Sequence, residues 1–347
     1  SSVTTPSGGV FNSSGIPNTI TSVDYGPALS DFTTCNYSSR SGTAITMVAI
    51  HDVEGSYAGC ISWFKNCSAS ASAHYVMRSS DGQCTQMVLE SNKAWHIGSE
   101  NPYTLGIEHE GYNNNASWFN TTLLTASAAL VRDMCTDYSI NPLRCYFGPG
   151  CSGTTQQCQQ GTCVKVKGHQ MFPNQTHNDP GPYWNWDKYY KLLNNTPVVT
   201  TVTATGGTFY DTGGASANYS DDERKLWLFQ PSGGATSVSM SFTSFNLENN
   251  YDYMFIYDGN SVNSTLIGKY TSTVSPGTIN STGPNLLIEF RSDCATTAAG
   301  WAATYTTNAV VTPTTTTDVT APTTQIATVG AWKTANFTAT FTDADNS

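Results

Sequence analysis

The sequence predicts two folded parts of different class, an α/β part followed by an all-β part. Its 347 residues are enough for two domains and part of a third, at about 150 residues per domain. Strand-length apolar runs and amphipathic helical patterns mix up to about residue 193, whereas Thr, Ser, Gly and Asn dominate after Pro197. We expect an irregular N-terminal arm (1–34), an α/β domain (35–197), an all-β domain (198–308), a Thr/Pro-rich linker (309–322) and the start of a truncated β domain (323–347).

The α/β prediction depends on segments with clear periodicity. Apolar runs of strand length occupy 45–50, 74–77, 85–89 and 104–110, and Asp81-Gly82 lies between the second and third as a hairpin turn signal. Helical patterns occupy 57–66, 124–138 and 184–193, and Pro142 follows the second of them.

The all-β prediction depends on short alternating runs at 237–242, 252–257, 286–290 and 301–305, which are typical of a β-sandwich. The segment AVVTPTTTTDVTAP reads as an extended linker. The last 25 residues contain Ile326 and an alternating run at 336–341, and they are too few to bury a core.

Composition excludes several classes of partner and indicates a compartment. Only 12% of residues are charged, with 15 Lys and Arg against 25 Asp and Glu, for a net charge of −10. Nucleic acids and anionic membranes require clustered basic residues, so we expect neither as a partner. No stretch approaches the roughly 18 apolar residues of a membrane span. Ten cysteines indicate disulfides and a secreted or cell-surface protein.

Three residues of the α/β part are candidate zinc ligands. His51 ends an apolar strand, His169 follows Gly168 in VKGHQ, and Asp179 lies in the proline-stiffened segment HNDPGPYW. A catalytic zinc site needs three such ligands and one open position. On spacing alone, a structural role for each histidine remains the alternative.

Six motifs occur in one order: VAIHDVEG, SAHYVM before Asp81-Gly82, AWHIG, TLGIEHEG, KGH and HNDPGPYWNW. Over about residues 40–194 they resemble the zinc-dependent N-acetylmuramoyl-L-alanine amidases of the type-2 amidase and peptidoglycan-recognition-protein superfamily. The resemblance implies a central mixed sheet with flanking helices. It also implies a Zn²⁺ cofactor and hydrolysis of the lactyl amide between N-acetylmuramic acid and L-alanine in peptidoglycan.

The resemblance assigns roles residue by residue. His51, His169 and Asp179 match the zinc ligands, and Glu108 matches the carboxylate that contacts the zinc-bound water. Zinc lowers the pKa of such a water to roughly 7, and a carboxylate can then move its proton.

Two further histidines match family positions. His177 falls where other members carry a Lys or a similar donor that faces the developing oxyanion, and His96 matches a residue that lines the substrate groove. Two alternatives stay open: His177 could be the third ligand in place of Asp179, and Glu110 lies on the same strand face as Glu108.

Other residues of these motifs are expected to be structural. We interpret His74 and His109 as structural, with His109 pointing away from the face of Glu108. Trp95, Trp184 and Trp186 are candidates for a sugar-stacking rim, and core packing is the favoured interpretation.

The cysteine spacing predicts local disulfides. Cys145, Cys151, Cys158 and Cys163 crowd into one loop without the Cys-x₂-Cys spacing of a zinc knuckle, which favours two local disulfides. By resemblance to secreted relatives, Cys60 and Cys67 close a small loop. Nine cysteines precede residue 198 and one follows, so either one thiol is free or Cys294 bridges the domains.

The segments GGTFYDTGG, NYSDDE, LWLF, FNLENNYDYMFIYDG, LLIEFRSD and GWAATY resemble a CUB domain over about residues 203–307. The resemblance implies two antiparallel sheets. Some CUB domains bind Ca²⁺ through acidic loop residues, and Glu248, Asp252 and Asp293 match those positions. Solvated acidic loops are the alternative. A CUB domain has no catalytic machinery, so we expect it to bind a cell-surface glycan, wall polymer or protein.

Together these features favour a secreted peptidoglycan amidase with an accessory binding module. A non-catalytic peptidoglycan-recognition or adhesion protein on the same fold is the alternative. Such relatives usually lack a zinc ligand, whereas all three candidates and Glu108 are present here. A third hypothesis is hydrolysis of a different amide by the same zinc chemistry.

Overall fold

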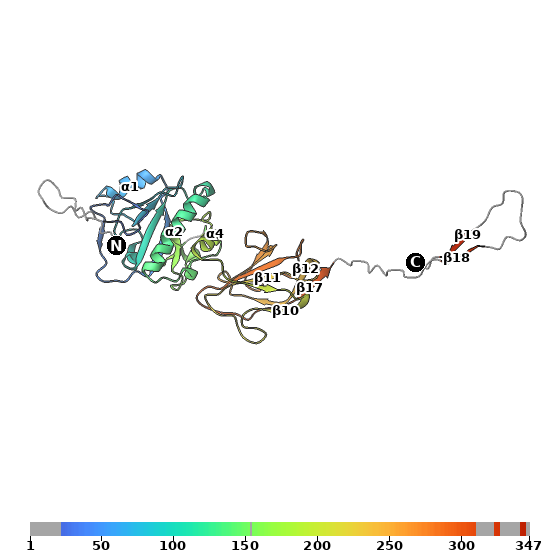
Figure 1. The fold of residues 1–347 in the computed structure, drawn as a ribbon. Coiled ribbons are helices and arrows are strands. Elements are labelled where there is room, and N and C mark those ends of the chain that lie inside the picture. The colour runs from blue at the N-terminus through green and yellow to red at the C-terminus, as the bar shows by residue number, and fades with distance from the viewer. Residues whose placement is uncertain (1–21, 153–154, 310–322, 327–340, 345–347) are drawn as a thin grey trace, which may run out of the picture. The chain divides into compact units, whose positions relative to one another are not determined.

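The computed structural model of the chain describes residues 22–152, 155–309, 323–326 and 341–344 (Figure 1). The described residues up to Asn308 belong to one compact unit, and those from Ala309 onward belong to a second. Most of the predicted linker, and residues 336–340 of the last predicted strand, lie outside the described residues. No helix among the described residues is long and apolar enough to cross a membrane.

The α/β part is built on a mixed sheet. Among the described residues the sheet has six strands, in the spatial order β1 (Leu29–Ser30), β5 (Cys84–Gln86), β4 (Tyr75–Met77), β7 (Thr104–His109), β3 (Met47–Asp52) and β8 (Val166–Gly168). The β4–β5 pair is antiparallel, as its hairpin turn predicts, and the other neighbours are parallel. β2 (Tyr37–Ser39) and β6 (Asn92–Ala94) form a small separate ladder. The predicted sheet class is confirmed.

The helices begin where side chains can cap them. Ser56, Asn120 and Asn185 each accept a hydrogen bond from a backbone N–H of the first turn. The helices they start are α1 (Tyr57–Lys65), α2 (Thr121–Asp137) and α4 (Trp186–Leu193). The shorter helical segments are α3 (Thr155–Cys158) and the 3-10 turns Gly98–Tyr103, Ala116–Trp118, Pro142–Arg144 and His169–Met171.

Strand alternation sends neighbouring residues to opposite layers of the α/β part. Val48 and Ile50 of β3 pack in the core that contains α2 and α4, whereas Val76 of β4 packs beneath α1. Because successive residues of a strand point to opposite faces, His51 lies on the face away from α2 and α4. Trp184 and Trp186 are buried in the α2–α4 layer, which confirms core packing for these two residues.

The all-β part is a sandwich of two sheets. One sheet has the order β10 (Gly206–Tyr210), β17 (Gly300–Ala309), β12 (Ala235–Asn246) and β15 (Thr278–Asn280). The other has the order β14 (Thr265–Tyr270), β13 (Tyr253–Asp258), β16 (Leu286–Arg291), β11 (Arg224–Phe229) and β9 (Val199–Val202). Most pairs are antiparallel, and β9 runs parallel to β11. The second unit contains β18 (Thr323–Ile326) and β19 (Phe341–Ala344), which pair antiparallel.

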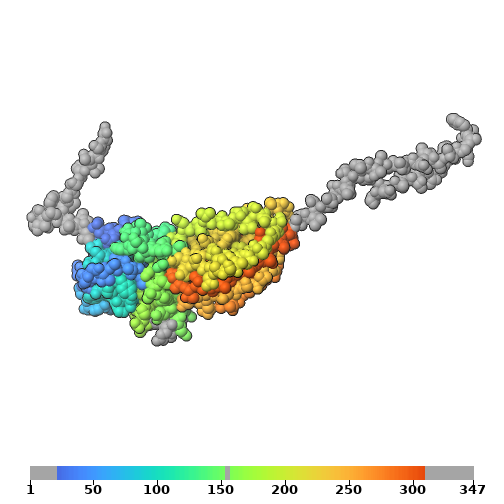
Figure 2. Space-filling view, turned by 90° about the horizontal axis from the view of Figure 1, so that it is seen from below, coloured from blue at the N-terminus to red at the C-terminus, as the bar shows by residue number. Residues whose placement is uncertain are grey.

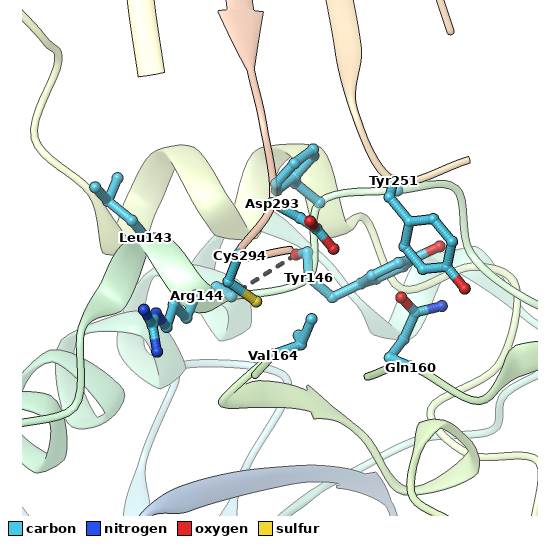
Figure 3. Close-up of a pocket in the computed structure, with 11 residues that line it drawn as sticks. Leu143, Arg144, Tyr146, Gln160, Val164, Tyr251, Asp293 and Cys294 are labelled. Atoms are coloured by element: carbon cyan, nitrogen blue, oxygen red, sulfur yellow. Dashed lines mark hydrogen bonds between the residues drawn. The ribbon is translucent and has the colours of Figure 1, made fainter. Parts of the chain in front are cut away.

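The α/β part and the sandwich share one apolar core and several polar contacts. Arg291 of β16 is fully buried, binds Glu289 through two hydrogen bonds of 2.8 and 2.9 Å, and lies 2.6 Å from Asp187 of α4. Figure 2 shows a continuous surface across the two parts. In Figure 3, Tyr146 and Val164 face Tyr251 and Cys294 across a cavity of about 10 Å³. The two parts are therefore packed against each other.

The disulfides of the described residues correct two predictions. Cys67 pairs with Cys35 rather than Cys60, because Cys60 lies on the buried face of α1 and points into the core. Cys151–Cys158 is the expected local bridge, but the second local bridge is wrong, since Cys163 pairs with Cys294. The alternative in which Cys294 bridges the two parts is confirmed. Free thiols are buried at Cys60, Cys84, Cys135 and Cys145.

Candidate metal centre

Three side chains from distant parts of the sequence converge at the end of β3. His51 Nδ1 lies 3.0 Å from Asp179 Oδ2 and 3.1 Å from His169 Nδ1, and His169 Nδ1 lies 3.1 Å from Asp179 Oδ1. Ligands about 2.0–2.1 Å from a tetrahedral zinc are about 3.3 Å apart, so these separations fit the edges of such a site. All three side chains are buried. The predicted ligands therefore come together in a geometry that fits zinc.

A close backbone approach positions two of these ligands. A Cβ atom at Gly168 would lie 2.5 Å from Cδ of Pro180, so a larger residue there would push the Asp179 loop away from β8. The Gln170 backbone N–H also donates to the carbonyl oxygen of Asp179 at 3.0 Å. The glycine before His169 is thus required by space, which explains the Gly-His pair.

Electrostatics favour the metal-binding protonation states. Burial lowers the pKa of His51 to about 4, although the Asp179 carboxylate 3.0 Å away opposes this. Burial alone would raise the pKa of Asp179, but the adjacent imidazoles of His169 and His51 outweigh burial and lower that pKa. A neutral imidazole and an ionised carboxylate are the forms that bind a metal.

Glu108 lies beside the three-ligand cluster. It pairs in register with His51 on the adjacent strand β7, is half-buried, and lines the cavity in front of the cluster. Burial raises the pKa of Glu108 well above its ordinary value, and the carboxylates of Asp179 and Asp52 add to this. Glu110 is used structurally, because its oxygens accept the backbone N–H groups of Tyr57 and Ser79.

His177 lies at the rim and not in the cluster. Its ring stacks on His169 with centroids 4.7 Å apart, its Nδ1 is 3.9 Å from Asp179 Oδ1, and its side chain is 69% exposed. The structure therefore brings Asp179, rather than His177, into the group of three that could hold an ion.

The other predicted histidines have distinct environments. His96 lines the cavity, and its Nδ1 is 2.9 Å from Nε2 of His51. His74 and His109 are buried; His74 bonds Arg40, and His109 bonds the backbone oxygen of His51 and Ser127 of α2. The structural interpretation of His74 and His109 is confirmed.

A cavity of about 690 Å³ opens in front of the cluster. It is large enough for a glycopeptide fragment. Trp95 lines it, and so does Trp63 of α1, which is 55% exposed. Sequence reasoning missed Trp63; the available signal was that it falls outside the buried spacing of Cys60 and Phe64 on the same helix.

A second cluster of acidic residues lies in loops of the sandwich. Carboxylate oxygens of Glu248, Asp252 and Asp293 all lie within 4.8 Å of one another. Burial and the neighbouring carboxylates raise the pKa values of Glu248 to about 8 and Asp252 to about 7. The structure thus brings the three predicted calcium ligands together.

The α/β part is a mixed sheet with a His-His-Asp cluster that could hold a metal ion, and a β-sandwich follows it. The N-acetylmuramoyl-L-alanine amidase family model matches residues 41–182, and the CUB domain model matches residues 199–305. Over 174 residues the chain is 43% identical to N-acetylmuramoyl-L-alanine amidase A of Achromobacter lyticus, covering 50% of this chain and 96% of that protein. The chain therefore belongs to the N-acetylmuramoyl-L-alanine amidase family and carries a CUB domain.

Two further comparisons cover single parts of the chain. Neuropilin-1 of Xenopus laevis is 32% identical over 109 residues, which is 30% of this chain and only 12% of that protein. A selenomethionine derivative of AmpD aligns with 49% of this chain and 96% of its own, at 20% identity and a TM-score of 0.39.

Proposed function

We propose that this chain is a zinc-dependent amidase that cleaves the lactyl amide between N-acetylmuramic acid and L-alanine in peptidoglycan. The observation that carries the proposal is the convergence of His51, His169 and Asp179 beside Glu108 at one cavity. The identity to an N-acetylmuramoyl-L-alanine amidase over the same part of the chain supports the choice of substrate.

The donor set fits zinc, since two imidazoles and one carboxylate leave a fourth position open toward the cavity. Bound zinc would supply Lewis acidity, which lowers the pKa of a coordinated water to about 7 and polarises a carbonyl oxygen. Glu108 accepts a proton in the cavity and delivers it to the leaving amine, a role that its raised pKa suits.

His177 and the tryptophans serve the substrate. From the rim, the His177 ring donates a hydrogen bond to the carbonyl oxygen as negative charge develops there, which typically contributes about 10²–10³ in rate. Trp63 and Trp95 offer flat faces along the cavity for sugar rings or peptide side chains.

The sandwich extends this proposal. We propose that the α/β domain spans residues 35–197 and that the CUB domain, 198–308, binds a cell-surface glycan, wall polymer or protein. Glu248, Asp252 and Asp293 hold Ca²⁺, because a hard cation relieves the repulsion among three close carboxylates. A disulfide within the α/β part and one that bridges it to the sandwich suit a secreted or cell-surface protein.

The test is digestion of purified peptidoglycan, read by mass spectrometry. We expect free peptides that begin with L-alanine and intact glycan strands, with both lost on chelation and restored by zinc. His51→Ala, His169→Ala and Asp179→Ala should each lose zinc and activity together. Retained binding to peptidoglycan with one bound zinc and no cleavage products would instead favour a recognition protein.

A further inference from the structure

We propose that His96 is a positioning residue of the metal centre: it accepts the Nε2–H of His51 and so holds His51 with a bare Nδ1 facing the metal. This inference rests on the proposed zinc site. It gives His96 a role different from the groove lining that resemblance alone implies.

The hydrogen bonds around His96 fix where each proton lies. The Thr104 hydroxyl donates to the carbonyl oxygen of Glu100 at 2.8 Å, and a hydroxyl has one hydrogen to give. The Thr104 hydroxyl oxygen must therefore accept the hydrogen bond from His96. Nε2 of His96 lies 3.2 Å from that oxygen and carries the hydrogen. A neutral imidazole has one N–H, which leaves Nδ1 of His96 bare. That atom lies 2.9 Å from Nε2 of His51, so His51 donates there and its own Nδ1 is bare.

The ring of His96 is held in this orientation. A Cβ atom at Gly106 would lie 2.5 Å from Cγ and Nδ1 of His96, so the ring occupies space that only glycine leaves open on β7. The backbone N–H of His96 donates to Oδ1 of Asn101 at 3.0 Å. The rings of His96 and His51 meet edge to face, with an interplanar angle of 90°.

His169 has a matching arrangement. Nε2 of Gln175 donates to the carbonyl oxygens of Pro173 at 3.0 Å and Ile97 at 3.4 Å, which turns its Oε1 toward His169. Nε2 of His169 lies 2.9 Å from that oxygen and must carry its hydrogen. Both imidazoles thus present bare Nδ1 atoms to one point, together with the Asp179 carboxylate. Without a cation, two bare nitrogens and a carboxylate within about 3 Å would repel.

Paired variants test the role of the acceptor atom. His96→Asn places Oδ1 near the position of Nδ1 and keeps the acceptor, whereas His96→Leu removes it at similar volume. Zinc affinity is measured by competition with a chromophoric chelator on the whole chain, with melting temperature as the folding control. We expect His96→Leu to bind zinc about 10–100-fold more weakly and His96→Asn to stay within about 3-fold of the unmodified protein.

One further variant and one kinetic measurement separate positioning from groove lining. Gln175→Leu removes the acceptor of His169 and should weaken zinc binding about as much as His96→Leu does. This variant tests the same principle even if the His96 variants fail to fold. At saturating zinc, KM of His96→Leu should match that of the unmodified protein.

The outcomes separate this inference from the function on which it rests. Unchanged zinc affinity in His96→Leu, or equal losses in the Asn and Leu variants, would overturn the positioning role. A raised KM with normal zinc affinity would return His96 to the substrate groove. Failure of the unmodified protein to bind zinc at all would overturn the proposed function and this inference together.

Discussion

Removal of the Cys163–Cys294 disulfide is expected to destabilise the chain more than removal of a local bridge. The two cysteines are separated by 131 residues, whereas Cys151 and Cys158 are separated by 7. In the chain-entropy treatment, a cross-link over the longer loop stabilises by about 5 kcal/mol, and one over the shorter loop by about 2 kcal/mol. The difference of about 3 kcal/mol is large against a typical folding free energy of 5–15 kcal/mol.

The assay is equilibrium unfolding in guanidinium chloride of the double variants Cys163→Ala/Cys294→Ala and Cys151→Ala/Cys158→Ala. Both should still fold, because Arg291, Glu289 and Asp187 keep the α/β part packed on the sandwich. Equal losses of unfolding free energy in the two variants would refute the reasoning. The reasoning would also be refuted if Cys163→Ala/Cys294→Ala unfolded in two transitions and neither midpoint differed from that of the unmodified protein. The disulfide would then join two units that unfold independently.

Three further perturbations test the active site, the acidic cluster and the buried ion pairs. Glu108→Gln should retain zinc and lower turnover about 10²–10⁴-fold, checked by metal content and product analysis; unchanged turnover would remove Glu108 from the mechanism. Asp252→Asn should abolish a calcium-dependent rise in melting temperature without changing amidase rate. Because the pKa of Asp252 is raised to about 7 and that of Glu248 to about 8, that rise should be present at pH 9 and be lost as pH falls from 8 through 7. The calcium-free protein should lose stability as pH rises between about 4 and 8; a calcium effect independent of pH would contradict this. Glu289→Gln should lower the unfolding free energy by about 3–5 kcal/mol, because it leaves the buried guanidinium of Arg224 without its carboxylate partner and Arg291 with Asp187 alone. Asp31→Asn, in an exposed pair with Lys65, should lower it by less than about 1 kcal/mol; equal losses would refute the argument that burial makes the first ion pair matter more.

Local patterns predicted most elements of the α/β part. The apolar run that ends at His51 became β3, and the helical spacing after Asn120 became α2. These predictions hold because strand and helix periodicities depend on residues a few positions apart. β1 was not predicted, since two exposed residues carry no periodicity and become a strand only by pairing with β5.

The sequence predicted which residues form the candidate site but not how they are arranged in space. His51 and Asp179 meet although 128 residues separate them, and only the order of the strands brings β3 beside β8. Cys60 illustrates the opposite case, because its nearness to Cys67 in sequence suggested a bridge that its position on the buried face of α1 prevents.

The sequence by itself determined the secondary-structure periods, the acidic charge and the set of ligand-type side chains, because each is a property of neighbouring residues or of composition. Only the tertiary structure decided which thiols pair, which nitrogen of each histidine faces the ligand cluster, and that Trp63 borders the cavity. Those facts depend on contacts between residues far apart in the chain. Their distances and hydrogen bonds exist only once the sheet has assembled and the sandwich has packed against it.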